Sequence, residues 1–170
     1  MNPLLYLLII PGLTVAGITL VKDMKQVRLV AAVGMSLQLL WSFVLLYWFY
    51  QLRAAGHTEE MLFVSSTTWY EAFNIQYKFG VDGVSMAMIL LTSIVTFAGI
   101  FASWQVAVLT REFFISLIIL AGGVFGFFIS LDLFTMFLFY EVAVIPMYLL
   151  IGIWGSGPKD IWVVGNDAPL

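Results

Sequence analysis

The sequence predicts an all-α integral membrane protein with five transmembrane helices and a long outer loop in which a short β-hairpin is expected. Of its 170 residues, 62% are apolar and only 10% are charged, and the mean hydropathy is +1.04. A soluble domain has about 45–50% apolar and about 25% charged residues. The apolar residues also gather in runs close to the roughly 20 residues that a helix needs to cross a bilayer. A soluble domain is therefore excluded.

The apolar runs are separated by charged or polar turns. They are Leu4–Val21, Leu29–Leu52, Val84–Leu109, Phe113–Leu131 and Leu133–Trp154. Lipid cannot pair exposed backbone groups, and no run alternates as a barrel strand does, so each run is expected to be a helix. The first run lacks a preceding basic residue and a following cleavage site, so we expect it to be retained rather than removed as a signal peptide. Residues 1–157 would form the five-helix part and residues 158–170 an irregular tail.

The distribution of Lys and Arg predicts how the helices are oriented. Cytoplasmic loops carry an excess of these residues. Most of them would fall on one side of the membrane and two on the other: Lys22, Lys25, Arg28, Arg111 and Lys159 against Arg53 and Lys78. We therefore expect a multi-pass protein of the cell (inner) membrane with its amino terminus outside.

The connection Arg53–Gly83 is the predicted outer loop. Within it, apolar and polar residues alternate over Ile75–Val81, which indicates a half-buried strand, and Leu62–Thr68 is the expected hairpin partner. The same loop holds His57, in a His-Thr-Glu-Glu stretch. This stretch lacks the ligand spacing of a metal site, so solvated surface is the favoured interpretation.

Charge and composition also exclude several functions. The 7 Lys and Arg residues against 10 Asp and Glu give a net charge of −3, which cannot neutralise a row of phosphates, so no nucleic-acid partner is expected. The absence of cysteine excludes a disulfide framework and iron–sulfur ligation. With a single histidine as well, the chain is expected to bind no metal and no haem.

Glu141 is the acid that lies inside a predicted span. It is eight residues into the last run, about 12 Å from the start of a helix about 33 Å long, and so near the middle of a hydrocarbon layer about 30 Å thick. An ionised side chain there costs at least about 2.5–3.5 kcal/mol. Hydrocarbon favours the neutral carboxyl and a nearby cation favours the charged one, so such a group can take up and release a proton. A proton relay is favoured over a packing role.

Two residues near Glu141 strengthen this interpretation. Pro146 lacks the amide hydrogen that would bond the carbonyl of Val142, which frees an acceptor beside the acid. Tyr148 is seven residues from Glu141 and therefore on the same helix face, where its hydroxyl can extend a hydrogen-bonded path. No Lys or Arg lies within the five runs, so a cationic partner of Glu141 would come from outside this chain.

Small and polar residues in the other spans are interpreted mainly as packing features. Gly122 and Gly126 have the Gly-x-x-x-Gly spacing that permits close helix approach. Polar side chains on the second and third runs can bond between helices or line a wet path, and packing is the favoured use: Ser36, Gln38, Ser42, Thr92 and Thr96.

Three stretches resemble one known family. They are the Glu141-x-x-x-x-Pro146-Met147-Tyr148 run that ends in Gly152-Ile153-Trp154-Gly155, the segment Phe79–Ser85, and the segment Phe125–Asp132. These resemble the antiporter-like subunit M (chain 4) family of proton-pumping NADH:quinone oxidoreductase, respiratory complex I. The resemblance covers the chain as far as Gly157, in the same order as in the family.

The resemblance implies a membrane-arm subunit that contributes to proton translocation coupled to quinone reduction. The resemblance leaves open whether the isolated chain has an activity and implies that it is part of an NADH:quinone oxidoreductase, a translocase, when assembled. Other subunits would bind NADH, flavin, iron–sulfur clusters and quinone, and its partners would be these membrane-arm subunits and the lipid bilayer. Glu141 matches the family's glutamate of the fifth helix, which pairs with a lysine on the seventh.

The sequence departs from the family after Gly157, and the lysine-bearing helix is not in it. A gene fragment, a frameshifted or truncated product, and one half of a split subunit are the interpretations of this departure. Two alternative functions remain: a subunit of a multi-component Na⁺/H⁺ antiporter, whose large subunits resemble the family, and a truncated non-catalytic membrane protein. The sequence around Pro146 favours complex I over the antiporter.

Overall fold

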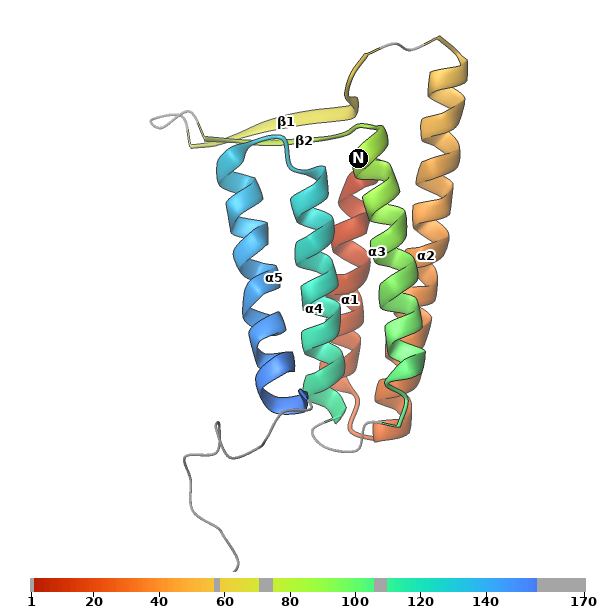
Figure 1. Ribbon diagram of the computed structural model, residues 1–170, viewed down its shortest axis with the longest axis vertical. Coiled ribbons are helices and arrows are strands. Elements are labelled where there is room, and N and C mark those ends of the chain that lie inside the picture. Colours follow the sequence, from red (N-terminus) through yellow and green to blue (C-terminus); the bar gives the residue numbers. More distant parts are fainter. Residues whose placement is uncertain (1, 57–58, 71–74, 106–109, 156–170) are drawn as a thin grey trace, which may run out of the picture.

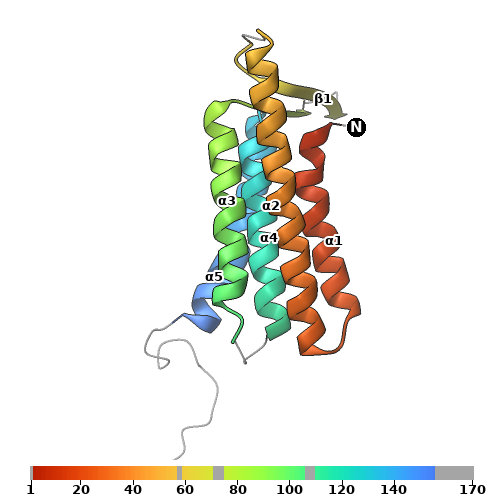
Figure 2. The ribbon, with the colours of Figure 1, turned by 90° about the vertical axis from the view of Figure 1, so that its right-hand side faces the viewer.

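The computed structural model describes residues 2–56, 59–70, 75–105 and 110–155, with the backbone alone at 67–70 and 75–76. Five helices stand side by side, and a two-stranded sheet lies across one end, here termed the hairpin end (Figures 1 and 2). In chain order the elements are a 3₁₀ turn at Pro3–Leu5, α1 (Tyr6–Leu20), α2 (Met24–Ala54), β1 (Leu62–Tyr70), β2 (Ile75–Val81), α3 (Gly83–Ala102), α4 (Thr110–Ile129) and α5 (Leu133–Trp154).

The predicted five spans are confirmed among the described residues. Five helical segments are long and apolar enough to cross a membrane. Two boundaries differ most from the prediction. The second helix begins at Met24, five residues early, because Asp23 accepts a hydrogen bond from the amide of Lys25 at 3.2 Å and so caps a charged first turn. The third helix ends at Ala102, and residues 106–109 of the predicted run lie outside the described residues.

The acids that separate the spans act as helix caps. Asp82 Oδ1 accepts the amide of Ser85 at 2.7 Å at the start of α3. Asp132 Oδ2 accepts the amides of Phe134 and Thr135, at 3.0 and 3.2 Å, at the start of α5. Each cap pairs amide groups that the helix itself leaves unbonded.

The cap at Asp82 gives a prediction about acid stability. The amide and then the hydroxyl of Ser85 hold the pKa of Asp82 below its usual value of 3.8. A depressed folded pKa adds stability above the unfolded pKa, and this stability is lost as pH falls through the folded value. We expect Asp82→Ala to lower the stability of the protein in detergent near pH 7 by about 0.5–2 kcal/mol. Thermal unfolding at pH 7 and below pH 3.8 tests this: the difference between Asp82→Ala and the parent should shrink at the lower pH, and an unchanged difference would contradict it.

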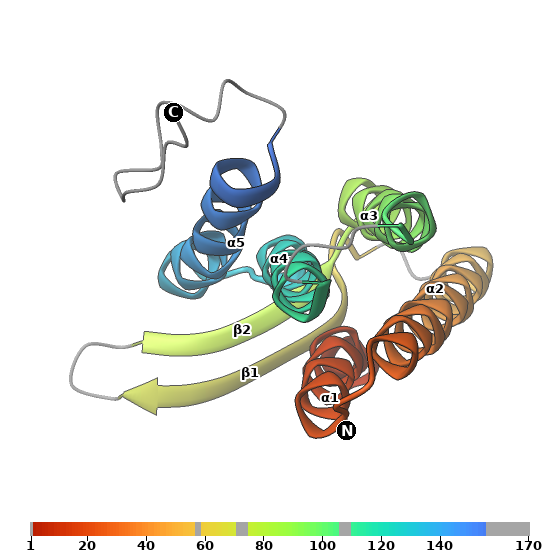
Figure 3. The same ribbon diagram turned by 90° about the horizontal axis from the view of Figure 1, so that it is seen from below.

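Helix α4 is the central element of the bundle. It packs against α5, α1 and α3, while α2 packs against α1 and α3 (Figure 3). Helix α5 rests mainly on α4, so only 6% of its most apolar 18-residue window is buried. The other helices share their packing among several neighbours, and α5 is left with a bare face.

Small residues on α4 allow α5 to approach it closely. A Cβ on Gly123 would come within 2.7 Å of the backbone nitrogen of Ala143, and a Cβ on Gly126 would overlap the ring of Phe139. The same addition at Gly122 meets Pro11 of α1 at an ordinary 3.6 Å. The predicted close approach is confirmed at Gly126, but the second tight position is Gly123 rather than Gly122.

The predicted hairpin is also confirmed. Strands β1 and β2 pair antiparallel, with Leu62 opposite Val81 and Thr68 opposite Gln76. The hairpin is tied to the helix ends, because the Asn2 side chain donates to the carbonyl of Phe63 at 2.6 Å. On β2, the carbonyl of Lys78 accepts the amide of Leu131 at 2.8 Å, in the turn between α4 and α5. The hairpin thereby joins the start of the chain to the start of α5 (Figure 1).

Candidate functional site

Glu141 lies midway along α5, as the sequence predicts. It is the ninth residue of 22 in a helix that runs without interruption from Leu133 to Trp154, which places it about 12 Å from the start. Its side chain is exposed on the bundle surface. Within the part of the chain that the structure describes, Glu141 makes no hydrogen bond and no ion pair. A carboxyl at this depth therefore faces either lipid or further protein.

The three predicted site residues do not come together. Pro146 is buried and lines a groove with Ser116 and Ile119 of α4, so it faces the bundle. Tyr148 is 63% exposed and shares the bare face with Glu141. The site thus consists of an acid and a tyrosine seven residues apart on one face, with the proline on another.

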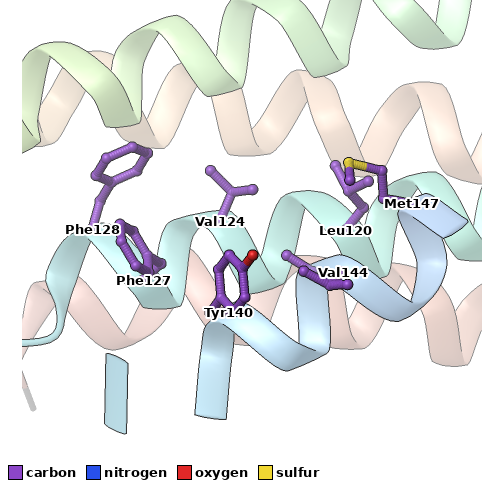
Figure 4. Close-up of a pocket in the computed structure, with 8 residues that line it drawn as sticks. Leu120, Val124, Phe127, Phe128, Tyr140, Val144 and Met147 are labelled. Carbon is purple, nitrogen blue, oxygen red and sulfur yellow. The ribbon is translucent and has the colours of Figure 1, made fainter. Parts of the chain in front are cut away.

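A larger groove between α4 and α5 has a different character. It has a volume of about 310 Å³ and is lined by Leu120, Val124, Phe127, Phe128, Tyr140, Ala143, Val144 and Met147. The Tyr140 hydroxyl is the one side-chain polar atom in this lining, as Figure 4 shows. A polar substrate needs several hydrogen-bond donors and acceptors at fixed positions. The lining of this groove therefore fits a hydrocarbon chain better than a polar molecule.

A second polar group lies inside the bundle. Ser42 Oγ of α2 and Ser93 Oγ of α3 are 2.6 Å apart, and both residues are buried. Ser42 and Gln38 were named from the sequence as polar packing residues, but Ser93 was not. The signal was available, since Ser93 stands in a buried stripe of α3 with a spacing of three and four residues: Met86, Ile89, Ser93, Thr96 and Ile100.

Two residues named from the sequence, His57 and Lys159, lie outside the described residues, as does the predicted irregular tail at residues 158–170.

Comparison with known proteins identifies relatives of one kind. NAD(P)H-quinone oxidoreductase chain 4-2 of Synechocystis sp. is 34% identical over 141 residues, or 82% of this chain. NADH-quinone oxidoreductase subunit M of Buchnera aphidicola subsp. Schizaphis graminum is 34% identical over 140 residues, or 78% of this chain. The chloroplastic chain 4 of Chara vulgaris is 37% identical over 100 residues, or 59% of this chain. No family model matches the chain.

The chain is a homologue of subunit M and chain 4 of the NAD(P)H-quinone oxidoreductases. The chain spans between 20% and 27% of the length of these three relatives. The fold has a counterpart in the solved structure of the membrane-bound sulfane sulfur reductase, an archaeal respiratory membrane complex, with a TM-score of 0.70 and 14% identity. That alignment covers 94% of this chain and 32% of the other, so the subunit M homologue has the fold of one part of a larger respiratory membrane protein.

Proposed function

We propose that this subunit M homologue carries the acidic half of a proton relay in a membrane channel coupled to quinone reduction. The observation that carries the proposal is the carboxyl of Glu141, which has no partner among the described residues and lies halfway along a helix fit to span a membrane. A lone ionised group facing hydrocarbon is costly. The cost falls if further protein covers α5 and brings a cation to Glu141, since a nearby cation favours the charged carboxyl.

The surroundings of Glu141 support this arrangement. Among the five described helices, α5 is the least covered, with 6% of its apolar 18-residue window buried against 28–39% for the others. The relatives are several times longer than this chain, so a complete subunit has enough sequence to cover the bare face. Approach of the cation would release the proton of Glu141, and its withdrawal would favour uptake.

The proposal also assigns partners and cofactors. The relatives are subunits of quinone oxidoreductases, which favours complex I over an Na⁺/H⁺ antiporter. We assign NADH, flavin, the iron–sulfur clusters and quinone to other subunits, and the membrane-arm subunits are the partners of this chain. The decisive test is the number of protons translocated per electron when Glu141 is neutralised in the assembled enzyme.

The proposed orientation places the amino terminus and the hairpin outside the cell membrane. The cations of the described residues favour this orientation. Four lie at or beside the helix ends opposite the hairpin and two lie at the hairpin end: Lys22, Lys25, Arg28 and Arg111 against Arg53 and Lys78. The chain lacks cysteine, so single cysteines report topology cleanly. A membrane-impermeant maleimide should label Ser66→Cys in intact cells and Lys25→Cys only after permeabilisation. The reverse labelling pattern would show that the amino terminus and the hairpin lie on the cytoplasmic side.

A further inference from the structure

The polar cluster between α1, α2 and α3 is independent of the proposed relay. Gln38 and Ser42 of α2 are fully buried, and Ser93 of α3 is 2% exposed. The Gln38 side-chain nitrogen, Nε2, donates to the carbonyl of Leu7 in α1 at 3.4 Å. The cluster therefore links three spanning helices through polar contacts, whereas Glu141 stands on α5, which packs mainly on α4.

The hydrogens of the two serines are fully used within their own contacts. Besides the 2.6 Å contact between them, Ser42 Oγ lies 3.0 Å from the carbonyl of Gln38 and Ser93 Oγ lies 2.9 Å from the carbonyl of Ile89. Each serine has one hydrogen to donate. Whichever serine donates to the other, its partner donates to a backbone carbonyl, so both hydrogens are used and none remains for the Gln38 side chain.

The Gln38 side-chain oxygen, Oε1, is a buried acceptor without a donor among the described residues. The Leu7 carbonyl can only accept, so the amide must turn its nitrogen to Leu7 and its oxygen to the unpaired position. Buried acceptors of this kind are almost always paired with protein or ordered water. We propose that Gln38 Oε1 binds an internal water molecule, so that the α1–α2–α3 cluster contains a binding site for water.

The chemistry of the cluster fits a water molecule. An internal water makes about three hydrogen bonds to buried polar groups. A water molecule carries two hydrogens and can therefore supply the donor that Gln38 Oε1 lacks. The site takes a neutral molecule, because among the described residues the charged side chains lie toward the helix ends, apart from Glu141 on α5.

A density map of the assembled membrane complex, at a resolution that shows ordered water, tests this proposal. We expect a peak about 2.6–3.2 Å from Gln38 Oε1. An empty space there, or a protein N–H or O–H group in its place, would overturn the proposal. The map of the parent enzyme decides the question alone, so a variant that fails to assemble does not leave it open.

Two variants of one helix sharpen the test. Gln38→Met keeps the length of the side chain but removes the acceptor, and the peak should disappear. Gln51→Met is the matched control on α2, because Gln51 is exposed and donates to the Tyr47 hydroxyl at 2.8 Å, and the peak should remain. A peak that persists in Gln38→Met would also overturn the proposal, and it would do so without bearing on the role of Glu141.

Discussion

Replacing Glu141 with Gln should reduce proton pumping in the assembled enzyme far more than electron transfer. The glutamine keeps the size of the side chain but cannot take up or release a proton. We expect the ratio of protons translocated to electrons transferred to fall well below that of the parent enzyme, since the spanning helix loses the carboxyl that takes up and releases the proton. NADH-to-quinone electron transfer should decrease but persist, because its cofactors are assigned to other subunits. Vesicles that report both rates provide the measurement.

Two further variants make the result specific. Glu141→Asp keeps a carboxyl and should retain part of the pumping. Glu112→Gln removes an exposed acid near the start of α4 and should leave the ratio unchanged. If Glu141→Gln kept the parent number of protons translocated per electron, Glu141 would have no role in the relay. If Glu112→Gln lowered that number equally, the loss would be a general effect of removing a negative charge.

The spans and the hairpin were predictable because their signals are local. Long apolar runs specify spanning helices in any tertiary context, and the alternation over Ile75–Val81 specifies a strand with one face buried. Helix boundaries were less certain. A charged turn looks like the end of a span, yet Asp23 caps α2 and lets Lys25 and Arg28 occupy its first turns.

The faces of the helices could not be predicted in the same way. Helix α5 is apolar on nearly all sides, so its sequence does not indicate which face meets α4. The depth of Glu141 followed from counting residues, whereas its exposure depends on the rotation of α5 against α4. The same limit explains why Gly122 was named as a contact and Gly123 was not, since the two differ by about 100° around the helix axis.

The contact that sets the rotation of α5 gives the second large expected effect. At Gly123 the obstacle to a Cβ is backbone, because the nitrogen and Cα of Ala143 would lie 2.7 and 3.0 Å away. Backbone cannot swing aside as a side chain does, so Gly123→Ala must push α5 from α4. We expect a net loss of about 1–3 kcal/mol of stability, as for overpacked cores, although alanine favours helix by about 1 kcal/mol.

Gly152→Ala is the matched control, since the same methyl group on α5 meets nothing within 4 Å. It should keep or raise the thermal unfolding midpoint of the protein in detergent, while Gly123→Ala lowers it. Equal rises of the unfolding midpoint in both variants would mean that α4 and α5 are further apart than described.

Because α4 is the main support of α5, displacement at Gly123 also moves Glu141 relative to whatever covers the bare face. Gly123→Ala should therefore reduce proton pumping with the carboxyl chemically intact, and this separates the position of the acid from its presence.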